Sequence, residues 1–454
     1  MNVLYINTHD TGRMISPYGY DVPTPNLKKF AADATIFTQS YCASPTCSPS
    51  RAALLTGMYP HQNGMLGLAQ RGFKIDYSKH LVNYLNNKDF HTVLCGIQHE
   101  AGFYLDHEAG ARTIGYQEDI TCSNSGYRQE DLTIWDQKNA DELSKWIDSY
   151  DKKKPFFISY GMYATHRRYP DIIDDEINEN MVYPPYPIPN NIETRRDHAE
   201  FMTSAKSADI CFEKVIQSLK HNDLYEDTII IFTTDHGLPN PFCKCTLFDT
   251  GIGVSLIMKV PDSNTKGAVV DNLVSNIDVF PTLCDLLGLE KPDYIEGKSF
   301  AKSFEDAEAP TRDEVFAEVS FHTSYEPIRC VRTKRYKYIR HYDPSYLRIN
   351  QSNIDEGLTK DFFMKNDLDE CLKYEEALYD LYYDGGERNN LIEDHKYHSI
   401  KAQLRDKLGH HLKTTKDFIL EGEIPISKEW KVNKKECKQA SSKKENDYVS
   451  LGKG

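Results

Sequence analysis

Four apolar runs along the chain each end in a short polar segment. An apolar run without polar alternation is typical of a strand that is buried on both faces, and the polar residues after it mark the loop at its carboxyl end. The pattern therefore predicts four buried strands. They lie in "NVLYIN" from residue 2, "HTVLCGIQHE" from residue 91, "KPFFISYGMYATH" from residue 154 and "DTIIIFTTDHG" from residue 227.

Segments with helical periodicity lie between these strands. Apolar residues recur at helical spacing in "TPNLKKFAADA" from residue 24 and in "HAEFMTSAKSADICFEKVIQSLKHN" from residue 198. Strands that alternate with helices indicate an α/β fold with a large, mostly parallel sheet flanked by helices.

Each predicted strand delivers a histidine or an aspartate to its carboxyl end. In an open α/β sheet, ligands bind outside the carboxyl ends of the strands. Because all four ends carry such residues, the pattern predicts a functional site at this edge of the sheet. The residues are His9, Asp10, His99, His166, Asp235 and His236.

The pattern changes after about residue 310. Short β-like runs follow, "EVFAEVSFH" and "IRCVRTKRYKYIRHY", and they predict a smaller domain with an antiparallel sheet. The final segment is rich in Lys, Glu and Ser, which is typical of a solvated tail. We expect a catalytic domain at 1–310, a C-terminal α+β subdomain at 311–427 and a polar tail at 428–454.

Composition excludes several classes of protein. No apolar run approaches the ~20 residues of a membrane-spanning helix, and the first residues show no secretory leader. The formal net charge of -14 argues against a nucleic-acid partner. Eleven cysteines, an odd number without framework spacing, indicate reduced thiols. We therefore expect a cytoplasmic protein that binds neither membranes nor nucleic acid.

Cys47 lies in "SPTCSPSRAALLTG", just before a predicted short helix that ends at Gly57. A helix N-terminus favours an anion, because its backbone N–H groups are unpaired. No second cysteine or histidine pair stands at zinc-site spacing. Cys47 is therefore either a buried thiol that acts as a small apolar residue or a member of the predicted site. The histidines and aspartates at the strand ends favour the site.

The motif Cys-x-Pro-x-Arg at residues 47 to 51, followed by "AALLTG", resembles the signature of the sulfatases, in the alkaline-phosphatase-like superfamily. Within this family, "CSPSRAALLTG" with "HQNGMLGL", and "SFHTSYEPIRCVR", are similar to the N-sulfoglucosamine sulfohydrolase branch. The resemblance implies removal of sulfate from a sulfated sugar, N-sulfoglucosamine derived from heparan or heparin. It extends along most of the chain through "HDTG", "GIQH", "ATH", "TTDHG", "KCTLFDTGIGVSLI" and "VSNIDVFPTLCDLLGL".

The resemblance implies that Cys47 is oxidised to Cα-formylglycine. A formylglycine-generating enzyme or an anaerobic sulfatase-maturing enzyme would then be a partner. A hydrated aldehyde offers one hydroxyl to attack sulfur and a second to expel the sulfate, whereas a thiol would leave a stable S-sulfonate.

The resemblance also implies a divalent metal. Asp10, Asp235 and His236 match metal-binding positions, and His9 stands where the family usually has an aspartate. Carboxylates favour a hard cation, so we expect calcium, with magnesium or manganese as alternatives. Imidazole is a poor calcium ligand, so either His9 lies outside the metal shell or the metal is not calcium.

The remaining roles follow from the same resemblance. Arg51 is expected to stabilise the formylglycine alkoxide, and His99 to deprotonate the hydrate. His166 and Lys244 are expected to contact the sulfo oxygens and protonate the leaving group. His322 and Arg329 are expected substrate contacts from the C-terminal subdomain.

Ile97 replaces the lysine that the family commonly has two residues before its histidine, and Arg13 or Arg167 could supply that charge. Three alternatives to N-sulfoglucosamine hydrolysis stay open. They are phosphonate monoester or phosphodiester hydrolysis on the same fold, O-sulfatase activity on another glycan, and sulfated-sugar binding without catalysis.

Overall fold

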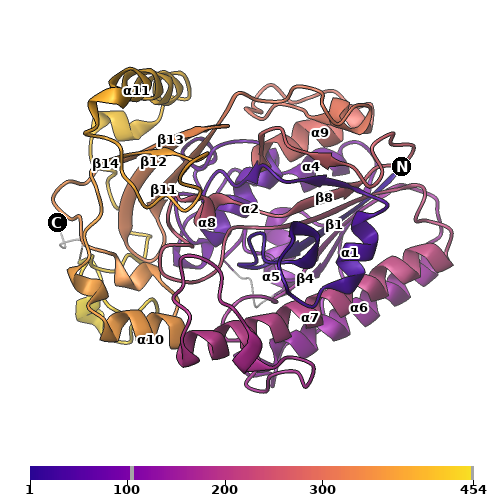
Figure 1. Cartoon of the computed structure of the whole chain (residues 1–454). Coiled ribbons are helices and arrows are strands. Elements are labelled where there is room, and N and C mark those ends of the chain that lie inside the picture. Colours follow the sequence, from indigo (N-terminus) through magenta and orange to yellow (C-terminus); the bar gives the residue numbers. More distant parts are fainter. Residues whose placement is uncertain (103–106, 451–454) are drawn as a thin grey trace.

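The computed structural model describes residues 1–102 and 107–450. Its centre is an eight-stranded sheet with the strand order β5-β4-β6-β1-β7-β8-β2-β9, and helices cover both faces of this sheet (Figure 1). Its strands are β1 (Asn2–Thr8), β2 (Thr35–Phe37), β4 (His91–Gly96), β5 (Glu118–Asp119), β6 (Phe156–Gly161), β7 (Thr228–Thr234), β8 (Leu256–Lys259) and β9 (Val269–Val270).

The four strands predicted from apolar runs are β1, β4, β6 and β7. They are neighbours in the sheet and all run parallel. Their carboxyl ends are level, because Gly161 pairs with both Asn7 and Gly96, and Thr8 pairs with Thr234. The loops after these strands therefore meet at one edge, as predicted.

Alternate residues of each strand pack against different helix layers. In β1, Leu4 and Ile6 face a core that contains α1, α6 and α7, whereas Val3 and Tyr5 face a core that contains α2, α4 and α9. Burial on both faces explains the unbroken apolar runs. The helices of this part are α1 (Pro25–Ala31), α2 (Cys47–Thr56), α3 (Pro60–Asn63), α4 (Leu81–Asn86), α5 (His107–Ile114), α6 (Leu132–Ser149), α7 (Ile192–His221), α8 (Asp249–Ile252) and α9 (Val279–Leu286).

A separate antiparallel sheet of four strands lies beside the large sheet, at the left in Figure 1. This sheet confirms the antiparallel element predicted after residue 310. The domain boundaries themselves remain predictions. The remaining elements are β3 (Ser40–Tyr41), β10 (Val274–Ser275), β11 (Glu314–Phe321), β12 (Tyr325–Thr333), β13 (Tyr336–His341), β14 (Glu376–Asp380), α10 (Leu358–Lys365) and α11 (His398–Thr414).

Part of residues 429–450 packs against the rest of the protein, which differs from the expected solvated tail. Trp430 stacks on Phe73 with ring centroids 4.3 Å apart, and Val432 is buried. The guanidinium of Arg71 donates to the carbonyl of Lys431 at 3.0 Å and also to the side chain of Asn433. Polar composition does not reveal that a buried arginine requires these acceptors.

All eleven cysteines are free thiols, which confirms the prediction of reduced cysteines. Among the residues with described positions, no helix is both long and apolar enough to span a membrane.

A buried ionic network joins α3 to the C-terminal sheet. The His61 backbone N–H donates to Glu318 Oε1 at 2.9 Å, and its ring Nδ1 contacts the other oxygen of Glu318. Asp417 lies 3.7 Å from the same ring nitrogen and binds Arg329 at 2.6 Å. Burial lowers the pKa of His61, but attraction to Glu318 and Asp417 outweighs burial, so the pKa is raised.

We expect the stability contributed by His61 to depend on pH. Since its folded pKa is raised, the contribution is fully present below the unfolded value of about 6.5 and is lost as pH rises through the folded value. The urea midpoint of the wild type should therefore fall more between about pH 6 and about pH 9 than that of His61→Gln. Parallel midpoint curves for the two proteins would contradict a charged His61 in this network.

Candidate active site

The residues predicted at the strand ends meet where α2 begins. Cys47 is the first residue of α2 and is buried. The preceding Thr46 is extended and Gly57 ends the helix in the left-handed conformation, as the glycine in the motif predicted. The Sγ atom of Cys47 lies 3.4 Å from Nε2 of His236, in the loop after β7.

Asp235 holds the loops of this edge together. Its Oδ1 accepts the backbone N–H of Asp10 at 2.8 Å and that of His236 at 3.0 Å. Its Oδ2 lies 3.0 Å from Nδ1 of His9 and 3.3 Å from Nε of Arg51. Burial raises the pKa of Asp235, but attraction to His236, His9 and Arg51 outweighs burial, so the pKa lies well below its usual range.

Four buried ligand groups lie close enough to hold one metal ion. Ligand atoms of His9, Asp10, Cys47 and Asp235 all lie within 4.8 Å of one another. His9 Nδ1 faces Asp235, and within the described part of the chain its buried Nε2 makes no hydrogen bond. Burial lowers the pKa of His9 to about 3, which leaves a neutral ring that is able to bind a metal. The donor set therefore fits a divalent cation.

His236 directs one ring nitrogen at the carboxylate of Asp10. Its Nδ1 lies 2.9 Å from the Gly237 carbonyl, which can only accept, so Nδ1 carries the proton. Its Nε2 lies 3.2 Å from Asp10 Oδ1. Two acceptors at this distance repel each other unless a proton or a metal ion lies between them.

The thiol of Cys47 is not activated. Burial raises its pKa strongly, and the attraction of Lys244 only partly opposes this effect. A nucleophilic cysteine needs a lowered pKa, because the thiolate is the reactive form. Cys47 is therefore placed as a site residue whose unmodified thiol is a poor nucleophile.

Lys244 connects this group to the C-terminal part of the chain. Its Nζ donates to both oxygens of Asp10 at 3.2 and 3.3 Å and to Asp355 at 2.8 Å. Burial lowers the pKa of Lys244, but these two carboxylates outweigh burial and raise it. Asp355 was not predicted. It follows no apolar run, so no feature of the sequence pattern marks it.

The predicted histidines lie around the same group. His99 has a ring nitrogen within 4.8 Å of ligand atoms of His9 and Cys47. His166 is the most exposed of them, with 24% of its side chain accessible, and its Nε2 lies 3.9 Å from Asp10. His322 is buried, and burial together with the nearby charge of Lys244 lowers its pKa well below the usual value.

Arg329 does not belong to the site, so the expectation that it contacts the substrate is wrong. Its side chain is buried and binds Asp417, Ser320 and the Val319 carbonyl. The motif places Arg329 on a strand of the C-terminal sheet, and its side chain is committed to the ionic network with His61.

Ile97, which stands where the family commonly has a lysine, packs against Leu132, Trp135 and Tyr163. Arg167 makes two contacts of 2.6 Å with Asp197. Arg13 donates to the Ser40 carbonyl and lies over the Tyr41 ring. Both arginines are therefore engaged elsewhere.

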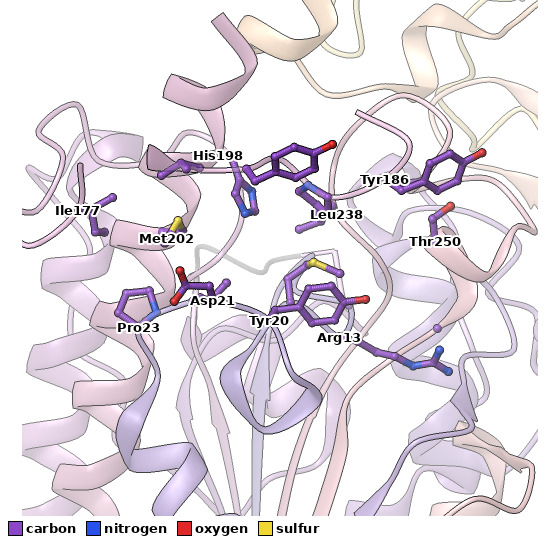
Figure 2. Close-up of a pocket in the computed structure, with 18 of the residues that line it drawn as sticks. Arg13, Tyr20, Asp21, Pro23, Ile177, Tyr186, His198, Met202, Leu238 and Thr250 are labelled. Atoms are coloured by element: carbon purple, nitrogen blue, oxygen red, sulfur yellow. The ribbon is translucent and has the colours of Figure 1, made fainter. Parts of the chain in front are cut away.

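A cavity of about 820 Å³ lies beside this group, next to Arg13. Figure 2 shows Tyr20, Asp21, His198 and Met202 around it, and the guanidinium of Arg13 points away from its centre. The residues that line this cavity include none of the predicted catalytic or metal-binding residues.

Comparison with known sequences identifies the family. A family model described as "Sulfatase" matches residues 1–289, which is more than half of the chain. The chain belongs to the sulfatase family. A second family model, "N-sulphoglucosamine sulphohydrolase, C-terminal", matches residues 235–371. Solved sulfatases share this alkaline-phosphatase-like fold, and the family supports a sulfohydrolase activity.

Three similar proteins illustrate the range of the fold. An ulvan-active sulfatase of Formosa agariphila is 26% identical, over 94% of this chain and 78% of its own. Human N-sulphoglucosamine sulphohydrolase is 25% identical, over 90% of this chain and 89% of its own. The phosphonate monoester hydrolase of Agrobacterium radiobacter has a TM-score of 0.69 and 19% identity, over 94% of this chain and 98% of that structure's chain.

Three aspartate-to-asparagine substitutions test which carboxylates bind the metal ion. Asp10 belongs to the group with His9, Cys47 and Asp235 and also to a second group with His166 and Asp355. We expect Asp10→Asn and Asp235→Asn to weaken binding of a divalent cation by at least about 100-fold, since even indirect partners of a metal contribute 10- to 100-fold. Asp355→Asn should retain the cation.

Isothermal titration of metal-stripped protein measures these affinities. If Asp355→Asn lost the cation while Asp235→Asn retained it, the metal would belong to the outer group and the assignment would be wrong.

Proposed function

We propose that this sulfatase hydrolyses N-sulfoglucosamine, with sulfate and the free amine as products. The observation that carries the proposal is the position of Cys47: it is buried at the start of α2, among residues to which the family resemblance assigns metal binding and catalysis. The match of residues 235–371 to the C-terminal family model of N-sulphoglucosamine sulphohydrolases supports this substrate.

Maturation of Cys47 to formylglycine would solve the problem of the unreactive thiol. One hydroxyl of the hydrated aldehyde would attack sulfur; loss of the proton from the second hydroxyl would then expel sulfate and return the aldehyde, and water would restore the hydrate. His99 lies close enough to Cys47 to take the proton that elimination requires. Arg51 places a positive charge beside Asp235, where it stabilises negative charge on the modified residue.

The positions of His166 and Lys244 support roles for both residues at the leaving group. His166 lies at the accessible side of the group and contacts Asp10 at 3.9 Å. Lys244 is held between Asp10 and Asp355, so its ammonium is fixed in position to contact a sulfo oxygen. We propose that His166 donates the proton to the departing nitrogen and that Lys244 binds the sulfo group.

We propose a divalent cation bound by His9, Asp10, Asp235 and His236, which would polarise the sulfo group. The two carboxylates are ligands that calcium prefers, and calcium remains our prediction. His9 lies within the ligand group, and its nitrogen makes manganese the strongest competitor. Parallel reconstitution of metal-stripped protein with calcium, magnesium and manganese distinguishes these three candidates.

Two other activities are known among proteins similar to this chain. Likeness to a phosphonate monoester hydrolase shows the shared fold alone. An ulvan-active relative, at 26% identity, makes O-sulfatase activity on another glycan the second candidate. Sulfate or phosphate release from N-sulfoglucosamine, ulvan oligosaccharides, p-nitrocatechol sulfate and a phosphodiester distinguishes these activities.

Cys47 should be converted to formylglycine when the protein is expressed with a formylglycine-generating enzyme. Mass spectrometry of the tryptic peptide should then show the aldehyde, and Cys47→Ala should have neither the aldehyde nor activity. Active protein whose peptide contains only unmodified cysteine would exclude this mechanism.

His166→Ala should affect the two kinds of substrate unequally. An amine anion is a far poorer leaving group than a nitrocatecholate, so loss of the acid should lower kcat on N-sulfoglucosamine on the order of 10²-fold. The loss on p-nitrocatechol sulfate should be much smaller. Equal losses on both substrates would mean that His166 binds the sulfo group, and the acid role would pass to Lys244.

A further inference from the structure

A second cavity, of about 660 Å³, adjoins the active site at Lys244. Lys244 lines this cavity, while its Nζ contacts Asp10 and Asp355 in the catalytic group. Asn353 and Ile354, which directly precede Asp355, also line it. Lys244 is the one residue of the proposed catalytic group among the lining residues, so the cavity adjoins that group at the side chain proposed to bind the sulfo group.

Aromatic and apolar side chains form the two walls of this cleft. Tyr183 and Tyr186 come from the segment before α7, and Leu372 and Tyr374 come from the segment before β14. These four side chains are exposed, from 46% to 77%. Exposed apolar groups gathered around a concave surface are typical of a ligand site.

The segment with Tyr183 and Tyr186 separates this cleft from the cavity beside Arg13. Both residues and Thr250 line the two cavities. Figure 2 shows Tyr186 and Thr250 at the right-hand side of the first cavity. The hydroxyl of Tyr186 donates to the Gly386 carbonyl at 2.6 Å, which ties this wall to the C-terminal subdomain.

The charges of the cleft favour an anionic ligand. Its two carboxylates are already paired, Glu326 with Lys373 at 2.6 Å and Glu387 with Lys337 at 2.7 Å. Arg388 is exposed, and its guanidinium carbon lies 5.9 Å from the centroid of the Tyr186 ring. Among residues 1–102 and 107–450, no carboxylate lies within salt-bridge distance of Arg388. Its charge is therefore available at the mouth of the cleft.

We propose that this cleft binds the sugars next to the one that carries the sulfate, so that the substrate is an acidic oligosaccharide chain. The proposal rests on the proposed sulfatase function. Pyranose rings present C–H groups that pack on aromatic faces such as those of Tyr186 and Tyr374. Arg388 binds a carboxylate or a second sulfate of the neighbouring sugar. The volume exceeds what the sulfo group at Lys244 requires, and it lies within the range of sites that enclose a ligand.

The experiment compares kcat/KM for N-sulfoglucosamine with that for a heparin-derived tetrasaccharide that has N-sulfoglucosamine at its non-reducing end. We expect the wild type to prefer the tetrasaccharide by on the order of 10-fold or more. Tyr186→Ala and Tyr374→Ala should each lower this preference roughly 3- to 10-fold, the range that one aromatic contact contributes. Arg388→Ala should lower it and weaken its dependence on salt.

Tyr383→Ala is the matched control, because Tyr383 is 86% exposed on the same subdomain and does not line the cleft. A wild type without preference for the tetrasaccharide, or a Tyr374→Ala protein that retains the preference, would overturn the proposal. Melting temperatures verify that each variant is folded.

A binding measurement distinguishes failure of this proposal from failure of the proposed function. Calorimetry with the Cys47→Ala protein and heparin- or ulvan-derived tetrasaccharides requires no catalysis. If no sulfate is released from either the N-sulfated or the O-sulfated substrates, the proposed function is wrong, and the binding measurement alone then tests the cleft. Binding that Tyr374→Ala weakens supports the cleft, and absence of binding to either tetrasaccharide overturns it.

Discussion

The active site depends on the hydrogen bonds and ion pairs of one buried carboxylate, that of Asp235. It accepts the backbone N–H groups of Asp10 and His236 and lies beside His9 and Arg51. These partners come from the loops after β1 and β7 and from α2, so one side chain fixes the relative positions of three segments. A carboxylate so deeply buried is stable only while these donors and charges surround it.

The site is completed by residues far along the chain. Lys244 extends from the Asp10 carboxylate to Asp355, which belongs to the segment before α10. The segments at the edge of the large sheet therefore supply Cys47 and the candidate metal ligands, and the C-terminal part supplies the Asp355 carboxylate beside Lys244. Substrate selection on this fold is expected to depend on that C-terminal contribution, because the groups around Asp235 serve the sulfo group that all sulfatase substrates share.

Much of the fold and part of the site could be predicted from the sequence. The four parallel strands were readable because burial on both faces produces unbroken apolar runs, and strand ends are where α/β sheets place their ligands. The helix start at Cys47 could be predicted because Gly57 marks the end of the same short helix. These signals are local, so one sequence is sufficient for them.

The errors concern side chains whose partners lie far away in the sequence. Arg329 has the residue type of a substrate contact, but Asp417 neutralises it within the protein. Asp355 belongs to no motif, and only the fold brings it to Lys244. The packing of Trp430 on Phe73 likewise depends on a tertiary contact that the polar composition around residue 430 does not reveal.

The central claim is that catalysis depends on a modified Cys47. The most direct test is to prepare samples with different degrees of maturation and to measure, in each, the fraction of residue 47 present as formylglycine and the sulfate-releasing activity. The account predicts that activity rises in proportion to this fraction and extrapolates to zero in unmodified protein. Activity that is independent of the fraction would contradict it.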